Sequence, residues 1–339
     1  MRERVWILVL TCVLTACAPR PTPEHPLRPA PPPAPAADVC APLLAEGPQP
    51  LPPPAIRPVD QQIRMVAFGD FGDGAWNQKR VAHAIYAQDR KHPFDFGLTL
   101  GDNFYPKGLD DPAGPRWERE WEQLYTRLRV RFYATLGNHD HLAEAAPEAE
   151  VQRSTKSESW CLPRRYYTFT AGPVQFFALD TNPIVQGEPS MEEQLAWLDG
   201  ALAASSARWK VVYGHHPVYS VGEDGSTPEI IARVLPLLKR HGVDVYLSGH
   251  EHDMEYLRPE ESLHFFVAGG GGHLVRPLGK DPERRKRWAK GKTPGFLTLE
   301  SAPEGESLRL SFFNTWRHRL CRVDLLKGQP ARVDCPGSV

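Results

Sequence analysis

Short apolar runs rich in β-branched and aromatic residues recur along the chain from about position 61, and each run ends in small or polar residues. They predict strands at 63–70, 94–102, 132–140, 174–181, 210–217, 243–252 and 264–272. Helix-like stretches lie between several of these runs, at 77–90, 191–204 and 228–241. Continuous apolar strands that alternate with helices form sheets covered on both faces. The pattern therefore predicts the α/β class, with sheets and helices in layers.

The beginning of the chain has the pattern of an export signal. Arg2 and Arg4 precede an apolar run that is too short to span a bilayer, and small residues follow it up to Cys17. The sequence Leu-Thr-Ala-Cys at 14–17 resembles the bacterial lipobox, in which the signal is cut before the cysteine and the cysteine carries lipid. The alternative is an ordinary secretory signal with an incidental cysteine. Under both interpretations the protein leaves the cytoplasm, and the lipobox predicts a bacterial cell-envelope protein anchored to the membrane through Cys17, facing the periplasm or the exterior.

Proline is abundant from position 18 to about 58, where it favours extended polyproline II. We expect this segment to be a semi-rigid spacer between the membrane and the folded domain, with a site for a proline-recognising partner as the alternative. The chain is thus predicted to have three parts: a lipoprotein signal peptide at 1–16, the lipidated cysteine and proline-rich linker at 17–58, and the folded domain at 61–335.

Composition narrows the classes of partner. The 339 residues are 41% hydrophobic, enough for a substantial core, and they include 40 basic and 41 acidic residues. A net charge of −1 gives no electrostatic footprint for nucleic acid, so no nucleic-acid partner is expected. A small phosphorylated substrate is compatible with this charge, and we expect a monomer.

Four cysteines follow the export segment: Cys40, Cys161, Cys321 and Cys335. In an oxidising compartment they can form two disulfides, and the sequence alone permits three pairings. We favour Cys321 with Cys335, which flank a turn-like LLKGQP segment, and Cys40 with Cys161. None of the four has the spacing of a zinc site.

Side chains that can bind metal ions follow the ends of five predicted strands. These residues are Asp70, Asp102, Asn138 with His139, His215, and His250 with His252. In sheets of this kind, the loops that leave the carboxyl ends of the strands build the site. One Asp or His at a strand end is more often a cap or a satisfied polar group, but five such ends in succession predict a metal site.

Five sequence blocks carry a family resemblance. In order along the chain they are GDFG (69–72), GDNFY (101–105), GNHD (137–140), GHHP (214–217) and GHEH (249–252). They resemble the blocks of the calcineurin-type metallophosphoesterases and, more closely, those of the purple acid phosphatases of the small, tartrate-resistant type. The resemblance extends over about 61–323. It implies a four-layer α/β/β/α sandwich and an acid phosphatase-like hydrolase with a binuclear metal centre.

The first two blocks differ from the commonest pattern of the superfamily. Most metallophosphoesterases begin with Asp-x-His, whereas this chain has Asp70-Phe71-Gly72 and lacks the histidine. Tyr105 is placed to supply the missing ligand. A phenolate is a hard, anionic donor that favours Fe(III) over Zn or Mn(II). The alternative is that Tyr105 is a packed aromatic residue at a strand end.

The resemblance implies a role for each ligand. Asp70, Tyr105 and His252 would bind the first metal, Fe(III), and Asp102 would bridge both metals. Asn138, His215 and His250 would bind a divalent ion (Fe, Zn or Mn). The alternation in the fifth block leaves Glu251 pointing away from the metals, and we expect its side chain to face outward. Attack of a metal-bound hydroxide on phosphorus would then cleave the phosphate ester.

Two further residues are candidates for catalysis. The resemblance implies that His139 hydrogen-bonds the phosphate or helps to protonate the leaving alcohol, although it could simply brace the GNHD turn. Asp224 stands where the small purple phosphatases have a second histidine on the substrate side. A carboxylic acid donates only while it is protonated, so Asp224 would lower the pH optimum or do nothing catalytic. We expect a structural role for His216, and His141 could brace Asp140 or the site.

Two segments near the end of the domain receive structural interpretations. The basic run at 280–292 is expected to be a solvated loop, with attraction of polyanions as the alternative. The glycines at 269–272 are not followed by the Lys-Ser/Thr of a phosphate-binding loop, and we expect them to let the chain pass close to the metals.

The sequence therefore predicts an exported phosphatase that hydrolyses phosphomonoesters. One alternative is a phosphodiesterase or nucleotide hydrolase with two Mn or Zn ions, which the missing histidine disfavours. Another is a cell-surface metal-binding module whose catalysis has lapsed, which the complete set of candidate ligands disfavours.

Overall fold

The structure is a computed structural model that describes Cys40 and residues 55–337. The predicted signal peptide, the predicted lipidation site Cys17 and most of the predicted proline-rich linker lie outside these residues. None of the helices in the described part of the chain has both the length and the apolar character needed to cross a bilayer.

The first of two sheets has eight strands, and its central strands are parallel to each other. In spatial order the strands are β1 (Ala55–Arg57), β6 (Tyr167–Ala171), β7 (Val174–Ala178), β8 (Trp209–Tyr213), β9 (Val245–Ser248), β11 (His264–Ala268), β10 (Met254–Leu257) and β12 (Lys286–Lys290). The parallel segment β7-β8-β9-β11 puts the carboxyl ends of four strands at one edge.

The second sheet also has eight strands and is mixed. In spatial order they are β16 (Arg332–Asp334), β15 (Arg319–Leu326), β14 (Ser307–Asn314), β13 (Gly295–Ser301), β2 (Arg64–Phe68), β3 (Phe96–Thr99), β4 (Phe132–Tyr133) and β5 (Trp160–Cys161). The strands β2 to β5 are parallel, whereas β13 to β16 form an antiparallel meander. The first three parallel strands are those that end in the GDFG, GDNFY and GNHD blocks.

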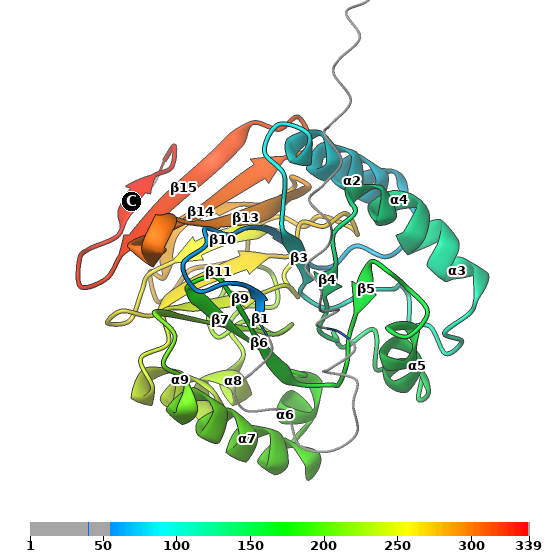
Figure 1. Ribbon diagram of the computed structural model, residues 1–339, viewed down its shortest axis with the longest axis horizontal. Helices are drawn as coiled ribbons and strands as arrows, with labels where there is room; N and C mark the ends of the chain where they lie inside the picture. The colour runs from blue at the N-terminus through cyan, green and yellow to red at the C-terminus, as the bar shows by residue number, and fades with distance from the viewer. Residues whose placement is uncertain (1–39, 41–54, 338–339) are drawn as a thin grey trace, which may run out of the picture. The chain divides into compact units, whose positions relative to one another are not determined.

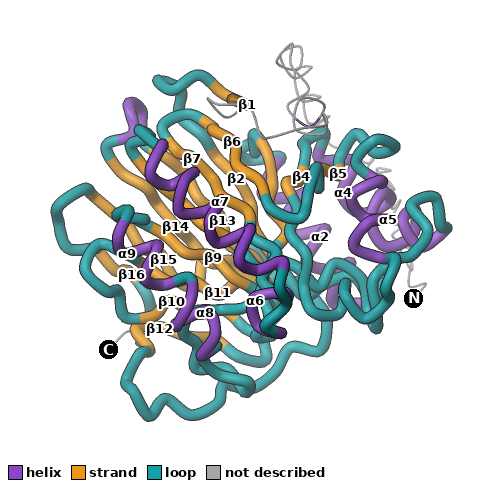
Figure 2. Tube along the Cα trace, turned by 90° about the horizontal axis from the view of Figure 1, so that it is seen from below, coloured by secondary structure: helices purple, strands orange, loops and turns teal. Residues whose placement is uncertain are grey.

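Helices cover the outer faces of the two sheets (Figures 1 and 2). Those on the first sheet are α6 (Asn182–Gln186), α7 (Ser190–Ala204), α8 (Pro228–Arg233) and α9 (Leu235–Arg240). Those associated with the second sheet are α2 (Trp76–Asp89), α3 (Pro115–Trp117), α4 (Gln123–Tyr125) and α5 (Ala146–Arg153), with a π-helical turn at Glu118–Glu122 and 3₁₀ turns at Thr126–Leu128 and Pro303–Gly305. The predicted four-layer α/β/β/α sandwich is confirmed.

Local sequence explains where two elements depart from the prediction. The helix predicted at 228–241 is two helices, α8 and α9, and Pro236 lies in the first turn of the second one, where its missing N–H costs least. The basic run predicted to be a loop contains β12, so that prediction is wrong for 286–290. This strand is the edge of its sheet, and its charged residues are solvated while Trp288 alone is buried.

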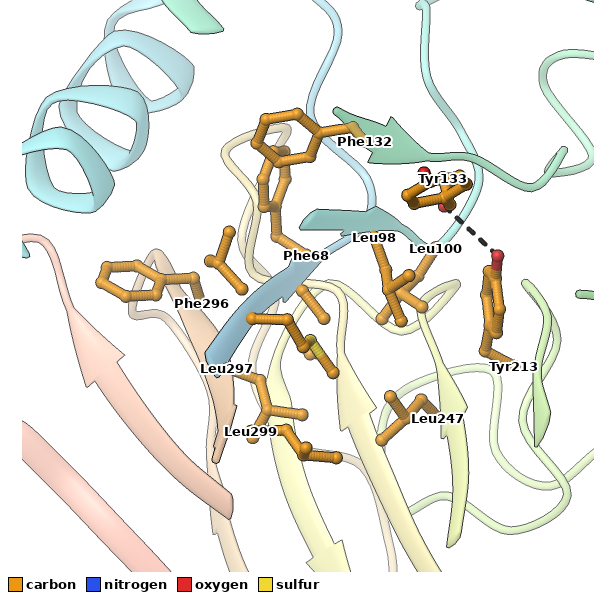
Figure 3. Packing of buried hydrophobic residues seen from close by; sticks show 14 of the residues in the cluster. Phe68, Leu98, Leu100, Phe132, Tyr133, Tyr213, Leu247, Phe296, Leu297 and Leu299 are labelled. Atoms are coloured by element: carbon orange, nitrogen blue, oxygen red, sulfur yellow. Dashed lines mark hydrogen bonds between the residues drawn. The ribbon is translucent and has the colours of Figure 1, made fainter. Parts of the chain in front are cut away.

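The main core lies between the two sheets (Figure 3). Phe68 and Leu98 from the second sheet and Leu247 from the first are fully buried there. Each such side chain contributes about 1.5–3 kcal/mol through removal of apolar surface from water. The Tyr213 hydroxyl donates a hydrogen bond of 3.4 Å to the carbonyl oxygen of Tyr133, which links the two sheets.

Both favoured disulfides are confirmed. Cys40 is bonded to Cys161, which ends β5, and the Cα atoms of the pair are 5.8 Å apart. Cys321 on β15 is bonded to Cys335, just beyond β16.

Candidate metal centre

The structure brings all seven predicted metal ligands together at one edge of the two sheets. The carboxyl ends of β2, β3 and β4 meet there with those of β8 and β9. The residues that follow these ends are Asp70, Asp102, Tyr105, Asn138, His215, His250 and His252. Both sheets therefore contribute to the site.

One group of donor atoms surrounds the hydroxyl of Tyr105. Its oxygen lies 2.7 Å from Asp102 Oδ2, 3.3 Å from Asp70 Oδ1 and 3.3 Å from His252 Nε2. Asp70 Oδ1 and His252 Nε2 are 3.6 Å apart. The ligand atoms of Asp70, Asp102 and His252 all lie within 4.8 Å of one another. This is the set predicted to hold the first metal.

A second group of donor atoms lies on the other side of Asp102. His215 Nε2 is 2.9 Å from Asn138 Oδ1, 3.2 Å from His250 Nδ1 and 3.4 Å from Asp102 Oδ1. His250 Nδ1 is 3.1 Å from Asn138 Oδ1. Asp102 thus presents one carboxylate oxygen to each group, as expected of a bridging ligand.

The backbone at three of the ligands is left-handed. The φ angles are 59° at Asp70, 50° at Asp102 and 69° at His250. Such angles are uncommon for residues other than glycine, and they persist where the surroundings hold the chain in place. Each of these residues directly follows a glycine at a strand end, so the chain turns sharply and aims the ligand across the edge of the sheets. A Cβ atom on the glycine at 269 would lie 2.6 Å from an Asp70 oxygen, which agrees with the predicted close passage of the 269–272 segment.

Hydrogen bonds on the far side of two imidazoles determine which nitrogen carries a proton. His215 Nδ1 lies 2.9 Å from the carbonyl oxygen of Leu100, and His252 Nδ1 lies 2.9 Å from that of His273. A carbonyl can only accept, so each Nδ1 is protonated and each Nε2 presents a lone pair. In the second group the lone pair of His215 therefore faces the carbonyl oxygen of Asn138, an arrangement that a cation between them would stabilise.

Burial determines the charge states of the ligands. It raises the pKa of Asp70 well above its usual value, and the charge of Asp102 raises it further. Burial, followed by the charges of the two aspartates, also raises the pKa of Tyr105. Burial lowers the pKa of His215 well below its usual value and lowers that of His252 to about 4, so both imidazoles are neutral. Multivalent cations would favour the ionised oxygen ligands, and neutral imidazoles are the form that binds metal, so the residues present fit a binuclear centre.

The missing histidine and the tyrosine are physically linked. A Cβ atom at Gly72 would lie 1.6 Å from the carbonyl oxygen of Asn103 and 2.9 Å from the Cα of Phe104. The loop that carries Tyr105 therefore lies directly against the backbone of Gly72, and the Tyr105 N–H donates a 2.8 Å hydrogen bond to the Gly72 carbonyl. Since a side chain at 72 would occupy the space of this loop, the glycine allows the tyrosine hydroxyl to lie next to Asp70, Asp102 and His252.

A buried carboxylate joins two of the ligand-bearing loops. Asp140 accepts hydrogen bonds from the backbone N–H groups of Gly137, Asn103 and Phe104, at 2.8, 3.0 and 3.2 Å. The Asn103 side chain donates in turn to the carbonyl oxygen of Thr135. Burial raises the pKa of Asp140 to about 7. This network holds the GDNFY loop against the GNHD loop.

His139 lies at the open side of the centre. Its backbone N–H donates a 2.8 Å hydrogen bond to Asp102 Oδ1, and its ring nitrogen Nδ1 lies 2.6 Å from the carbonyl oxygen of Pro106. Nδ1 is therefore protonated, and Nε2 is 4.0 Å from Asp102 Oδ2. The side chain is 30% exposed, so a substrate phosphate can reach it.

Two other histidines have structural partners. His141 Nε2 is 2.9 Å from Asp180 Oδ1, so it braces that residue rather than Asp140. His216 Nδ1 lies 2.8 Å from the hydroxyl of Thr181, and its backbone N–H donates to the same oxygen. These contacts agree with the structural role expected for His216.

The structure corrects the expectation for Glu251 and gives Asp224 a partner. Glu251 does not face outward: it is completely buried and accepts hydrogen bonds from the backbone N–H groups of Asp224 and Gly225. The Asp224 carboxylate is bonded to Arg276, with Oδ2 and Nη1 2.7 Å apart. A carboxylate that accepts from a guanidinium is not arranged to donate a proton.

Sequence reasoning missed two residues beside the centre. The ring of His273 stacks on that of Tyr105, with centroids 3.6 Å apart, and its Nδ1 lies 2.9 Å from Asp73 Oδ2. Arg276 donates its backbone N–H to the carbonyl oxygen of His252. The signal for His273 was its place directly after the GGGG segment, which is another strand end; Arg276 had no comparable signal.

Known proteins share these features. A family model for the calcineurin-like phosphoesterases matches residues 63–254. Purple acid phosphatase 7 of Arabidopsis thaliana is 32% identical over 273 residues, which cover 73% of this chain and 81% of that protein. Tartrate-resistant acid phosphatase type 5 of Mus musculus is 30% identical over 302 residues, which cover 78% of this chain and 88% of that protein. The solved structure of GAP50, the anchor in the inner membrane complex of Plasmodium, shares the fold at 20% identity, with a TM-score of 0.71 over 79% of this chain and 90% of that one. The chain therefore belongs to the calcineurin-like phosphoesterase family and, within it, to the purple acid phosphatases of the small, tartrate-resistant type, which makes it a metal-dependent phosphoric ester hydrolase.

Proposed function

We propose that the protein is an exported, lipid-anchored acid phosphatase that hydrolyses phosphomonoesters with a centre of Fe(III) and a divalent ion. The observation that carries the proposal is the position of the Tyr105 hydroxyl, 2.7 Å from Asp102 and 3.3 Å from both Asp70 and His252. A phenolate among carboxylates is a hard, anionic donor set that suits a trivalent ion. Asn138, His215 and His250 supply one oxygen and two imidazole nitrogens, which suit divalent Fe, Zn or Mn.

The protein's own groups orient and exchange protons around this centre. When bound, the two metals supply charge neutralisation for the phosphoryl group and an acidified water as the nucleophile. His139 keeps Nδ1 on Pro106 and directs Nε2 to the open side, where the substrate enters. When Nε2 is protonated it hydrogen-bonds a phosphate oxygen or donates its proton to the leaving alkoxide.

The test is a visible absorption spectrum, with elemental analysis, of the purified protein. We expect iron and a broad band in the green, and we expect Tyr105→Phe to lose the band while it keeps the fold, because only the hydroxyl is removed. Tyr256→Phe is the matched control, since the Tyr256 hydroxyl contacts His264 rather than a metal ligand. A colourless, active wild-type protein with divalent metals alone would contradict the role of Tyr105.

Membrane anchoring through Cys17 is the part of the proposal that rests on the lipobox-like sequence alone. Fractionation of cells that express the wild type and Cys17→Ala tests it. We expect the wild type with the membranes and the variant in the soluble fraction. A variant that still fractionates with lipid would contradict the lipobox interpretation.

A further inference from the structure

An ion pair lies beside the metal centre and takes no part in the ligand set. Arg276 Nη1 and Asp224 Oδ2 are 2.7 Å apart, and the two side chains are 33% and 51% exposed. They come from segments 52 residues apart in the sequence. Both groups are therefore accessible to solvent.

Both members of the pair are attached to the loop that carries two metal ligands. Arg276 donates its backbone N–H to the carbonyl oxygen of His252 at 3.0 Å, and Asp224 donates its backbone N–H to Glu251 Oε2 at 3.3 Å. Glu251 is completely buried and lies between His250 and His252 in the sequence. The two segments are also bonded to each other, because the N–H at Gly279 donates to the carbonyl oxygen of Val221 at 2.8 Å. The ion pair is thus held in a defined position relative to His250 and His252.

The segment that contacts the backbone of Arg276 is basic. The Lys292 N–H donates to the carbonyl oxygen of Arg276 at 2.7 Å, and Lys290 is paired with Met254, two residues beyond His252. The basic run that contains these lysines has seven basic and two acidic residues. The chain segment that follows Arg276 is therefore rich in basic residues.

The geometry points to Arg276 as the residue that binds a second oxyanion of the substrate, with Asp224 as the residue that positions its guanidinium. This inference rests on the proposed phosphatase function and names the preferred substrate class: phosphate esters or anhydrides that carry another phosphate or a carboxylate near the scissile bond. The transferred phosphate would lie at the metals and His139. Arg276 lies at the exposed rim, where the rest of the substrate extends, and its planar guanidinium matches an oxyanion with two N–H donors. Asp224, engaged as the acceptor in the ion pair, is then not the proton donor.

The experiment compares three substrates on the metal-loaded protein: p-nitrophenyl phosphate, whose aryl group carries no anionic substituent, inorganic pyrophosphate and 4-carboxyphenyl phosphate. For Arg276→Gln, we expect kcat/KM for the two substrates with a second oxyanion to fall by about tenfold to a hundredfold more than kcat/KM for p-nitrophenyl phosphate, the range for loss of a charged hydrogen bond. Arg276→Lys should recover part of this difference in kcat/KM, because lysine keeps the positive charge but lacks the paired N–H donors of the guanidinium. Whether pyrophosphate or the carboxylate substrate shows the larger effect distinguishes the two oxyanions.

A binding measurement and a control complete the test. Calorimetric affinity for methylenediphosphonate should fall in Arg276→Gln by more than the affinity for inorganic phosphate. Arg309→Gln is the matched control, since Arg309 on β14 forms an ion pair with Asp324 on β15. This variant should leave unchanged the ratios of kcat/KM between the three substrates and the ratio of the two affinities.

The outcomes separate the inference from the function on which it rests. Equal losses for all three substrates, or none, would overturn the role of Arg276. Failure of the wild type to hydrolyse p-nitrophenyl phosphate, together with Arg276-dependent binding of the diphosphonate, would overturn the proposed function and support the anion site.

Discussion

Replacement of Gly72 by alanine tests the link between the absent histidine and Tyr105. A Cβ atom at this position would lie 1.6 Å from the carbonyl oxygen of Asn103, and real Cβ atoms do not approach closer than about 3.0 Å. The Asn103 carbonyl must therefore retreat by about 1.4 Å. That shift breaks the hydrogen bond from the Tyr105 N–H to the Gly72 carbonyl and disturbs those that Asn103 and Phe104 donate to Asp140.

The cost follows from these contacts. Overpacking of a buried site destabilises by about 1–3 kcal/mol, and each lost hydrogen bond adds about 1 kcal/mol. We therefore expect Gly72→Ala to lower the free energy of unfolding by about 3–5 kcal/mol, a large part of the ~5–15 kcal/mol typical of a folded domain. Gly200→Ala is the matched control. It lies in α7 with no atom within 4 Å of the new Cβ, so it should stabilise by about 0.5–1 kcal/mol.

Urea unfolding of the metal-depleted proteins, followed by tryptophan fluorescence, measures the effect of each alanine on the fold alone. Iron content and the visible band of the same proteins after loading then report on the Tyr105 position. We expect Gly72→Ala to lose both stability and colour and Gly200→Ala to lose neither. If Gly72→Ala unfolds within about 1 kcal/mol of the wild type and keeps the band, the loop does not depend on the glycine and the reasoning is refuted.

Three other predictions concern stability and catalysis. The Cys40–Cys161 disulfide closes a much longer loop than Cys321–Cys335, with sequence separations of 121 and 14. Serine replacement of the first pair should cost about 5 kcal/mol of unfolding free energy and that of the second about 3; the reverse order in denaturant titrations would contradict the loop argument. Burial lowers the pKa of His264 to about 4 in the folded protein, so the unfolded chain alone gains this proton as the pH falls from about 6.5 to 4. Stability should fall through that window by up to about 3 kcal/mol more in the wild type than in His264→Gln, and identical pH profiles would refute this. His139→Ala should lower kcat for a phosphomonoester by about a hundredfold or more with unchanged metal content, whereas a wild-type kcat would leave His139 only a bracing role.

Much of the fold could be predicted because the chain alternates buried strands with amphipathic helices. The strand ends could be identified because Asp70, Asp102 and His250 each follow an apolar run and a glycine. The edge strand β12 could not be identified in this way, since only Trp288 is buried and the charged neighbours resemble a loop. The burial of Glu251 was equally hidden, because its hydrogen-bond partners come from a loop more than 25 residues away in the sequence. The stacking of His273 on Tyr105 depends on how the 269–272 segment crosses the centre. The sequence pattern of a single strand gives no information about that path.

The position of the Tyr105 hydroxyl depends on several loops of the structure. The Tyr105 hydroxyl lies between Asp70 and His252 because Gly72 leaves room for its loop, and because Asp140 holds that loop by its backbone N–H groups. On the other face, His273 packs against the phenol ring and is itself held by Asp73. A phenol placed at residue 105 without these supports would have no defined position between Asp70 and His252. The arrangement of the candidate ligands is therefore a property of four loops that pack together, and a side chain at residue 72 would compete with the loop of Tyr105 for the same space.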